Sequence, residues 1–86
     1  MEKAKPINQF QAGDHIEITS IQLTGVMRRR LLDLGFVPGA VVELNQKSPL
    51  GDPIAYKVCG TQVALRQEES VLITGKKRSA EERRSS

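Results

Sequence analysis

The stretch LLDLGFVPGAVV, residues 31–42, decides the fold because it joins the end of a predicted helix to the start of a predicted strand. Working upstream, Met27, Leu31 and Leu34 are spaced at i, i+4 and i+7. This spacing places three apolar side chains on one face of a helix. The sequence therefore predicts a single amphipathic helix over residues 25–34.

Both ends of this helix carry terminal signals. Thr24 precedes it and offers a hydroxyl oxygen as an N-cap. Gly35 stands where a helix ends in the left-handed region, and Phe36 follows to pack on the last turn, as in a Schellman motif. Pro38 and Gly39 then supply the fixed φ and the positive φ of a type II turn. The helix is thus expected to stop abruptly and lead into a strand.

Strands are predicted on both sides of the helix. Residues 15–20 alternate polar and apolar side chains, with Ile16 and Ile18 on one face, and this period of two indicates a half-buried strand. Residues 66–69 form a polar turn, of one helical turn at most. Four further strands, separated by turns rich in glycine or proline, are expected at Ala40–Lys47, Ile54–Cys59, Thr61–Leu65 and Ser70–Thr74.

The predicted fold is mainly β: a small, SH3-like, partly open barrel of about five strands with one short amphipathic helix between the first and second strands. An OB-fold is the nearest alternative, but its helix usually lies between the third and fourth strands. We expect an N-terminal extension at residues 1–12, the barrel domain at 13–75 and a charged, disordered tail at 76–86. The tail has no apolar side chain larger than Ala80, so burial cannot offset the entropy of ordering it.

The net charge of +3 is concentrated in this tail. Five of the 13 basic residues and two of the ten acidic residues lie in Lys76–Ser86, which leaves eight of each sign in residues 1–75. A nucleic-acid interface needs basic residues gathered on the folded surface, and only Arg28–Arg30 provides such a group. With three aromatic residues available for stacking, we expect no nucleic-acid partner. No segment is apolar for long enough to span a membrane, no secretory signal is evident, and a cytoplasmic location is expected.

The inventory of reactive side chains argues against an enzyme. His15 is the only histidine and Cys59 the only cysteine, so neither has the companions of a catalytic triad or a zinc site. We expect Cys59 to be a buried or half-buried filler. No glycine-rich phosphate-binding loop precedes a lysine, and the carboxylates are scattered through turns and solvent faces. We therefore predict no catalytic residue, no metal ligand and no cofactor.

Further motifs follow the opening stretch in order along the chain: PLGDPI at residues 49–54, Gly60, and ALR at residues 64–66. Together with LLDLGFVPGAVV they closely resemble the FeoA family of small SH3-like proteins of bacterial ferrous iron uptake. The resemblance covers nearly the whole of residues 15–74. It implies a cytoplasmic accessory or regulatory protein that acts by protein–protein interaction with the membrane permease FeoB, which would recruit it to the inner face of the membrane. The same domain occurs at the C-terminus of DtxR-type repressors, but this chain has no helix-turn-helix module to accompany it.

The motif residues are expected to act mainly as structure, in the core or in turns. They are Leu31, Leu34, Gly35, Phe36, Pro38, Gly39, Pro49, Gly51, Asp52, Pro53, Gly60 and Leu65. Five residues are candidates for contact with a partner: Arg28, Arg29, Arg30, Leu50 and Arg66. We hypothesise that the arginines of the helix steer the encounter while Leu50 supplies an apolar anchor on a loop stiffened by two prolines.

Two alternatives to the accessory role stay open from the residues. One is a small nucleic-acid-binding barrel, which the pI near 9.4 and Arg28–Arg30 would suit. The other is a free-standing metal-sensing domain like that of the repressors, with transition-metal binding as its activity. Arg66 also has two interpretations: a structural partner for Asp52 or an exposed side chain that reaches a partner.

Overall fold

The computed structural model describes residues 3–78, which form six strands, two helices and one 3-10 turn. In chain order these elements are β1 (Lys5–Pro6), η1 (Ile7–Gln9), β2 (His15–Ile21), α1 (Gly25–Leu34), β3 (Val41–Lys47), β4 (Ile54–Val58), β5 (Thr61–Leu65), α2 (Gln67–Ser70) and β6 (Ile73–Arg78). The strands make one antiparallel sheet in the order β1-β6-β2-β3-β4-β5.

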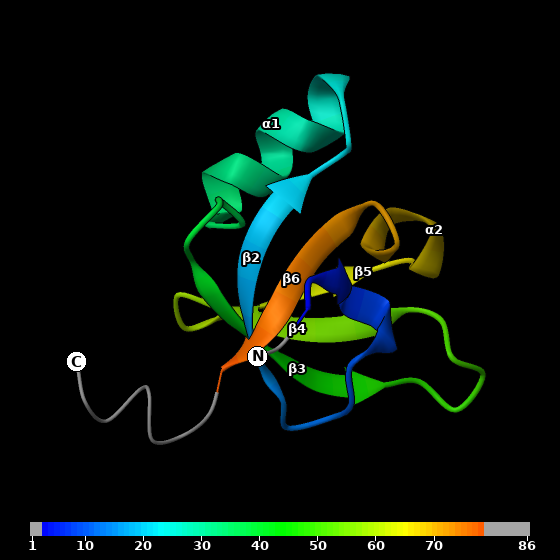
Figure 1. The fold of residues 1–86 in the computed structure, drawn as a ribbon. Coiled ribbons are helices and arrows are strands. Elements are labelled where there is room, and N and C mark those ends of the chain that lie inside the picture. The colour runs from blue at the N-terminus through cyan, green and yellow to red at the C-terminus, as the bar shows by residue number, and fades with distance from the viewer. Residues whose placement is uncertain (1–2, 79–86) are drawn as a thin grey trace.

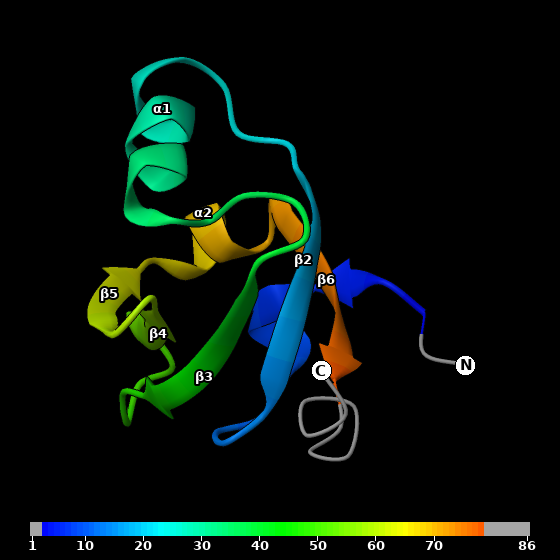
Figure 2. The same ribbon diagram turned by 90° about the vertical axis from the view of Figure 1, so that its left-hand side faces the viewer.

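This sheet curls into a partly open barrel (Figures 1 and 2). β1 and β5 stand at the two ends of the strand order and are not paired with each other. α1 lies at one end of the barrel, and α2 sits between β5 and β6. The predicted mainly-β, partly open architecture with one early amphipathic helix is confirmed, with β1 as an additional short strand.

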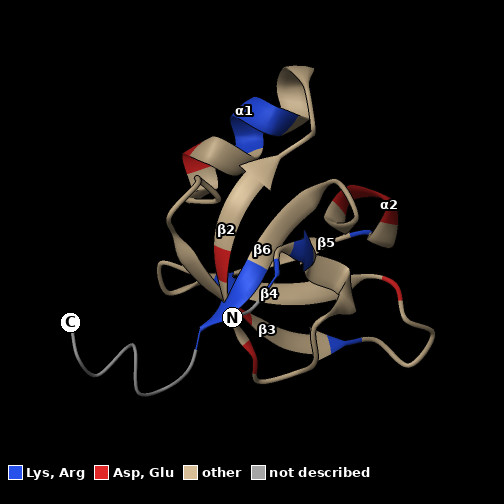
Figure 3. Ribbon diagram, in the orientation of Figure 1, with Lys and Arg blue, Asp and Glu red and all other residues tan. Residues whose placement is uncertain are grey.

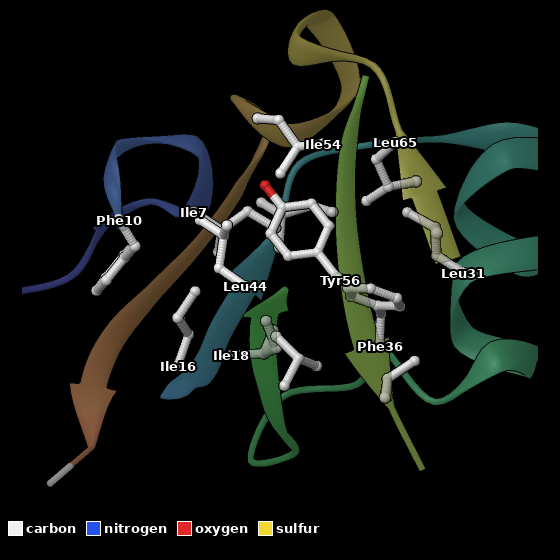
Figure 4. Close-up of a cluster of buried hydrophobic side chains, with 13 residues drawn as sticks. Ile7, Phe10, Ile16, Ile18, Leu31, Phe36, Leu44, Ile54, Tyr56 and Leu65 are labelled. Atoms are coloured by element: carbon white, nitrogen blue, oxygen red, sulfur yellow. The ribbon is translucent and has the colours of Figure 1, made fainter. Parts of the chain in front are cut away.

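The core is formed by side chains from every strand except β1, joined by α1 and η1. Tyr56 lies in the middle of this cluster, and its ring meets that of Phe36 edge-on with centroids 6.2 Å apart (Figure 4). The buried apolar residues are Ile7, Phe10, Ile16, Ile18, Leu31, Phe36, Val42, Leu44, Ile54, Tyr56, Val58, Leu65 and Ile73.

The predicted helix stop is confirmed. Gly35 has φ +108°, and its N–H donates to the carbonyl of Leu32 at 3.1 Å. The N–H of Phe36 donates to the carbonyl of Leu31 at 2.9 Å, so the two bonds are those of a Schellman motif. Thr24 occupies the N-cap position, but its side chain makes no capping hydrogen bond. The stop turns the chain sharply and brings Phe36 into the core.

The type II turn after the helix is also confirmed. The N–H of Ala40 donates to the carbonyl of Val37 at 2.9 Å, and Gly39 has φ +94°. The N–H of Gly39 then donates to the carbonyl of Ile18 at 2.8 Å, which ties the turn to β2. β3 therefore starts in register with the strand that it pairs with.

The N-terminal residues are part of the folded domain rather than an appendage to it. Ile7 is fully buried and Phe10 is nearly so. Lys5 and Pro6 form β1 against Gly75 and Thr74 of β6. These residues have no strand or helix periodicity in the sequence, so only their long-range packing identifies them as core.

The prediction that the tail begins at Lys76 is wrong for residues 76–78. Lys76, Lys77 and Arg78 continue β6 and pair with β2. Charged side chains are accommodated there because acidic residues of the N-terminal half face them: Arg78 Nη1 lies 2.8 Å from Glu17 Oε1, and Lys77 Nζ lies 3.5 Å from Asp14 Oδ1. Residues 79–86 lie outside the described part of the chain, and their predicted disorder stays a prediction.

The last strand also begins later than expected, at Ile73 instead of Ser70. Ser70 ends α2, with its side chain buried, and Val71 is 44% exposed. The expected alternation around Val71 fails because the helical turn extends one residue beyond the polar segment. The hydroxyl of Ser70 then meets that of Tyr56 inside the core.

Candidate interaction surface

α1 divides the three arginines between two sides of the helix. All three are exposed, and no ion pair joins any of them to a carboxylate in residues 3–78. Arg30 faces β5, whereas Arg28 and Arg29 line a shallow hollow on the outside of α1 together with Asp33. Figure 3 shows the resulting basic segment on α1, well apart from the basic end of β6. The helix thus presents positive charge on its outer face and also at its contact with the sheet.

A groove of about 130 Å³ separates α1 from β5. Its apolar lining includes the half-buried side chains of Met27 and Leu34 on α1 and of Val63 on β5. Arg30 and Glu69 add one charge of each sign. The groove therefore combines apolar walls with a cation on α1 and an anion on α2, and the α1 side suits the acidic group of a ligand.

β5 forms one edge of the sheet, because it pairs with β4 alone. It is joined to β4 by a two-residue turn in which Cys59 has φ +50° and Gly60 φ +78°. Two successive residues with positive φ make a type I′ turn, so the predicted glycine turn is confirmed. Cys59 is exposed in this turn, and the expectation that it fills a buried or half-buried position is wrong.

The loop between β3 and β4 presents the most exposed apolar side chain in the described residues: Leu50 is 94% exposed. The N–H of Gly51 donates to the carbonyl of Ser48 at 2.7 Å, and that of Ser48 donates to Pro53 at 3.2 Å, so the loop closes on itself. Figure 1 shows this loop and α1 in different parts of the molecule. The structure therefore does not bring Leu50 and the arginines into one patch.

This loop is held by Asp52, a motif residue, and by Gln67 and Asn8, which no sequence motif indicates. Asp52 Oδ1 accepts the N–H of Gln67 at 3.0 Å, and Gln67 Nε2 donates to the carbonyl of Gly51 at 2.8 Å. Asn8 Nδ2 donates to Gln67 Oε1 at 2.8 Å, which adds the N-terminal turn to the network. The GDP segment signals an acceptor at Asp52, but nothing local to it points to a donor 15 residues away.

Asp52 is therefore the partner of Gln67 and not of Arg66. No ion pair joins Arg66 to Asp52 among the described residues. The backbone N–H of Arg66 donates to Glu69 Oε1 at 2.9 Å, and its side chain is exposed just after β5. Of the two interpretations, the structural partner is wrong, and the exposed side chain stays a prediction of contact.

The potential metal ligands are separate. His15 Nε2 lies 3.8 Å from Glu43 Oε1, and Cys59 is in the β4–β5 turn. In residues 3–78 no group of three or more His, Cys, Asp or Glu side chains is placed to hold an ion. A closed site for a transition metal needs about four such ligands, so this part of the chain does not fit one.

A family model described as the FeoA domain matches residues 5–77, from β1 almost to the end of β6. The chain belongs to the FeoA domain family. The match includes both β1 and the charged end of β6, so the family's domain takes in the segments that sequence analysis placed outside the barrel.

Two solved structures resemble this FeoA domain along most of their length. The FeoA protein of Chlorobium tepidum is 36% identical with a TM-score of 0.82, and the match covers 86% of this chain and 70% of that one. FeoA of Stenotrophomonas maltophilia, described as an SH3 domain protein and solved with zinc, is 28% identical with a TM-score of 0.70. That match covers 87% of this chain and 88% of the other. The SH3-like fold class is confirmed.

A third relative is much longer. A fusion of Fe(2+) transport protein A with the Fe(2+) transporter FeoB, from Porphyromonas gingivalis, is 34% identical over 67 residues. These cover 78% of this chain and 8% of the fusion protein, so most of that protein has no counterpart in this FeoA domain. No helix in the part of the chain that the structure describes is long and apolar enough to cross a membrane.

Proposed function

We propose that this FeoA domain protein is a cytoplasmic, non-enzymatic accessory protein of ferrous iron uptake, which regulates a FeoB-type permease by binding its cytoplasmic part. The fusion protein of Porphyromonas gingivalis carries the proposal, because there a related domain and the transporter are one chain. Domains that are fused in one protein and separate in another commonly work as partners. The permease would then bring this protein to the inner face of the membrane.

The surface of the domain supports a binding role. Arg28, Arg29 and Arg30 are exposed without an ion-pair partner in residues 3–78, and such charges speed the encounter with an acidic surface. Leu50 stands on a loop closed by its own hydrogen bonds, so it loses little entropy when it docks. Each feature suits a protein contact on its own, although they lie in different parts of the molecule.

The test is a titration of the labelled protein with the purified cytoplasmic domain of the FeoB permease encoded in the same genome. We expect saturable one-to-one binding that weakens as the salt concentration rises. Single-stranded and duplex DNA of 20 nucleotides serve as parallel ligands, for which we expect no saturable binding. Tight DNA binding without permease binding would replace the proposal with the nucleic-acid alternative.

An anaerobic titration with Fe²⁺ tests the metal-sensing alternative. We expect no stoichiometric site, since His15 and Cys59 do not share a ligand group in the described residues. A one-to-one isotherm that is lost in His15→Ala or Cys59→Ser would favour a metal sensor or carrier. Mg²⁺ at the same concentration is the control for weak surface binding.

A further inference from the structure

The free edge of β5 carries unpaired backbone groups. Val58 and Thr61 flank the two-residue turn and form its hydrogen-bonded pair, so alternate residues from Thr61 onward direct both backbone groups toward β4. Gln62 and Ala64, which lie between them, direct their N–H and C=O groups away from the sheet. Neither backbone makes another hydrogen bond within residues 3–78. Two donors and two acceptors are therefore open to another strand.

The groove between α1 and β5 runs along this edge. Val63, Ala64 and Leu65 all line it. Because successive side chains of a strand point to opposite faces, a hollow that touches three consecutive residues follows the edge of the strand rather than one of its faces. Met27 and Leu31 form part of the opposite, helical wall. The open backbone groups thus lie beside an apolar wall.

The two edges of the sheet differ in how they are protected. β1, at one end, consists of Lys5 and Pro6, and lysine and proline are residues that discourage the pairing of an edge with another chain. β5, at the other end, reads Thr61-Gln62-Val63-Ala64-Leu65 and contains no charge and no proline. Figure 2 shows β5 at the outer end of the sheet, below α1. Of the two edge strands, only β5 contains neither lysine nor proline.

The charges beside β5 indicate what could pair with it. Arg30 lines the groove, and Arg28 and Arg29 follow on the outside of the same helix. Glu69 is the acidic residue in the groove, and its Oε1 accepts the N–H of Arg66 at 2.9 Å, so the three arginines leave positive charge in excess beside β5. None of the three is neutralised by an ion pair in the described residues. An incoming strand with acidic side chains complements this helix, whereas a basic strand is repelled by it.

We propose that β5 accepts an extended segment of a partner protein as an added antiparallel or parallel strand, and that this segment alternates apolar with acidic residues. Its backbone bonds to Gln62 and Ala64, one apolar side chain fills the groove, and an acidic side chain meets Arg30. The identity of the partner as the permease rests on the proposed function; the mode of binding does not. A groove of about 130 Å³ has room for little more than one such side chain.

Hydrogen exchange of the unmodified protein is the first test. In the free protein the amides of Gln62 and Ala64 should exchange rapidly, while those of Val63 and Leu65 are protected by β4. Saturation with the cytoplasmic domain of the permease should slow exchange at Gln62 and Ala64 at least tenfold. Unchanged exchange at both amides in a saturated complex would overturn strand addition and leave the proposed function intact.

A matched pair of variants is the second test. Ala64→Pro removes an N–H that points away from β4, and proline is tolerated at such an edge position. We expect this variant to keep its circular dichroism spectrum and to bind the permease domain at least tenfold more weakly. Ala64→Ser keeps the N–H and should bind within twofold of the parent. Equal binding by both variants would contradict the proposal.

A synthetic peptide separates the mode of binding from the identity of the partner. The probe is a capped heptapeptide in which valine alternates with glutamate, titrated into labelled protein and followed by NMR. We expect shifts at Gln62, Ala64 and Arg30 that are lost in Ala64→Pro. Two further peptides are N-methylated, one on every valine and the other on every glutamate. A strand bonds to its neighbour through alternate residues, so one of these peptides should lose binding and the other should keep it.

These arms give distinct outcomes. Peptide binding at β5 without any binding of the permease domain would support strand addition and refute the proposed function. Failure of the peptide together with unchanged exchange in the permease complex would refute strand addition. Concentration-dependent dimers in analytical ultracentrifugation that disappear in Ala64→Pro would identify the occupant as a second copy of this chain and overturn the choice of a partner protein.

Discussion

The hydroxyl of Tyr56 donates a hydrogen bond to Ser70 Oγ at 3.0 Å, and neither side chain has any accessible surface. This bond joins β4 to the last residue of α2 across the core. It gives the buried Tyr56 hydroxyl an acceptor in a cluster that is otherwise apolar, which accounts for a serine at this position. The C-terminal end of α2 is therefore fixed to β4 by this pair, while Gln67 at its other end is held by Asp52 and Gly51.

Ser70→Ala should lower the free energy of unfolding by about 1–3 kcal/mol, because it leaves the Tyr56 hydroxyl buried without a partner. Urea denaturation followed by circular dichroism measures this loss. The double variant with Tyr56→Phe removes both hydroxyls, so its loss should be smaller than the sum of the two single losses. Strict additivity would contradict the hydrogen bond.

Burial raises the pKa of Tyr56 from 10.0 to about 12, with the hydrogen bond to Ser70 opposing part of the rise. Below pH 10 the phenol is protonated in both the folded and the unfolded chain, so its stabilising effect is fully present there. Between pH 10 and 12 the unfolded chain loses the proton first, and stability should fall by about 2–3 kcal/mol.

The phenolate absorbance near 295 nm reports this group alone, because the chain has one tyrosine and no tryptophan. We expect a titration midpoint near pH 12 in the folded protein and near pH 10 in urea. Tyr56→Phe is the control for any loss of stability at alkaline pH that does not involve this phenol. A parent protein and a Tyr56→Phe variant that lose stability equally above pH 10 would refute the assignment.

Gly35→Ala and Gly39→Ala form a matched pair that separates backbone strain from crowding. Both glycines have positive φ, of +108° and +94°. A Cβ at Gly35 would lie 3.1 Å from Cys59 Sγ and from Val58 Cγ2, whereas a Cβ at Gly39 would meet nothing within 4 Å. Gly39→Ala should cost about 1–2 kcal/mol from its conformation, and Gly35→Ala about 1 kcal/mol more. Equal melting temperatures for the two variants would show that the contact at Gly35 relaxes freely.

Truncation after Gly75 should destabilise the protein by more than about 1 kcal/mol, because it removes the end of β6 with the ion pairs of Lys77 and Arg78. Truncation after Arg78 keeps these pairs. It should shift the free energy of unfolding by less than about 0.5 kcal/mol, since residues 79–86 offer no large apolar side chain. Thermal denaturation of both truncated chains tests whether the folded domain ends at Gly75 or at Arg78.

Local chemistry explains which parts of the fold could be predicted. Gly35, Pro38 and Gly39 act within a few residues of themselves, and the structure has the Schellman stop and the type II turn that they predict. The alternation of Ile16 and Ile18 likewise predicts a strand that has both residues buried. In each case the signal and the structure that it determines occupy the same short segment.

Contacts between distant segments explain the rest. Ile7 and Phe10 become core only because β6, more than 60 residues later, pairs with β1. Gly75 lies so close to β2 that a Cβ there would be 2.5 Å from Ile16 Cγ2, yet nothing in the sequence around this last residue of the predicted barrel indicates that contact. The groove beside β5 likewise lies between two elements that are distant in sequence, α1 and β5, so no sequence motif predicts it.

The last prediction concerns the arginines and Leu50, which the structure places in different parts of the molecule (Figures 1 and 3). If the permease domain contacts the helix, Arg28→Glu with Arg29→Glu should slow association and flatten its salt dependence, because steering acts on the rate of encounter. Lys3→Glu with Lys57→Glu makes the same change in net charge at two exposed positions away from α1 and serves as the control. Leu50→Ala should speed dissociation only if the loop is also covered. Surface-plasmon kinetics at low and high salt measure both rates, after circular dichroism has shown that each variant is folded.

Loss of association in the control as well as in the arginine variant would mean that net charge, and not the helix, steers the encounter. An effect of Leu50→Ala with none at the arginines would move the interface to the loop.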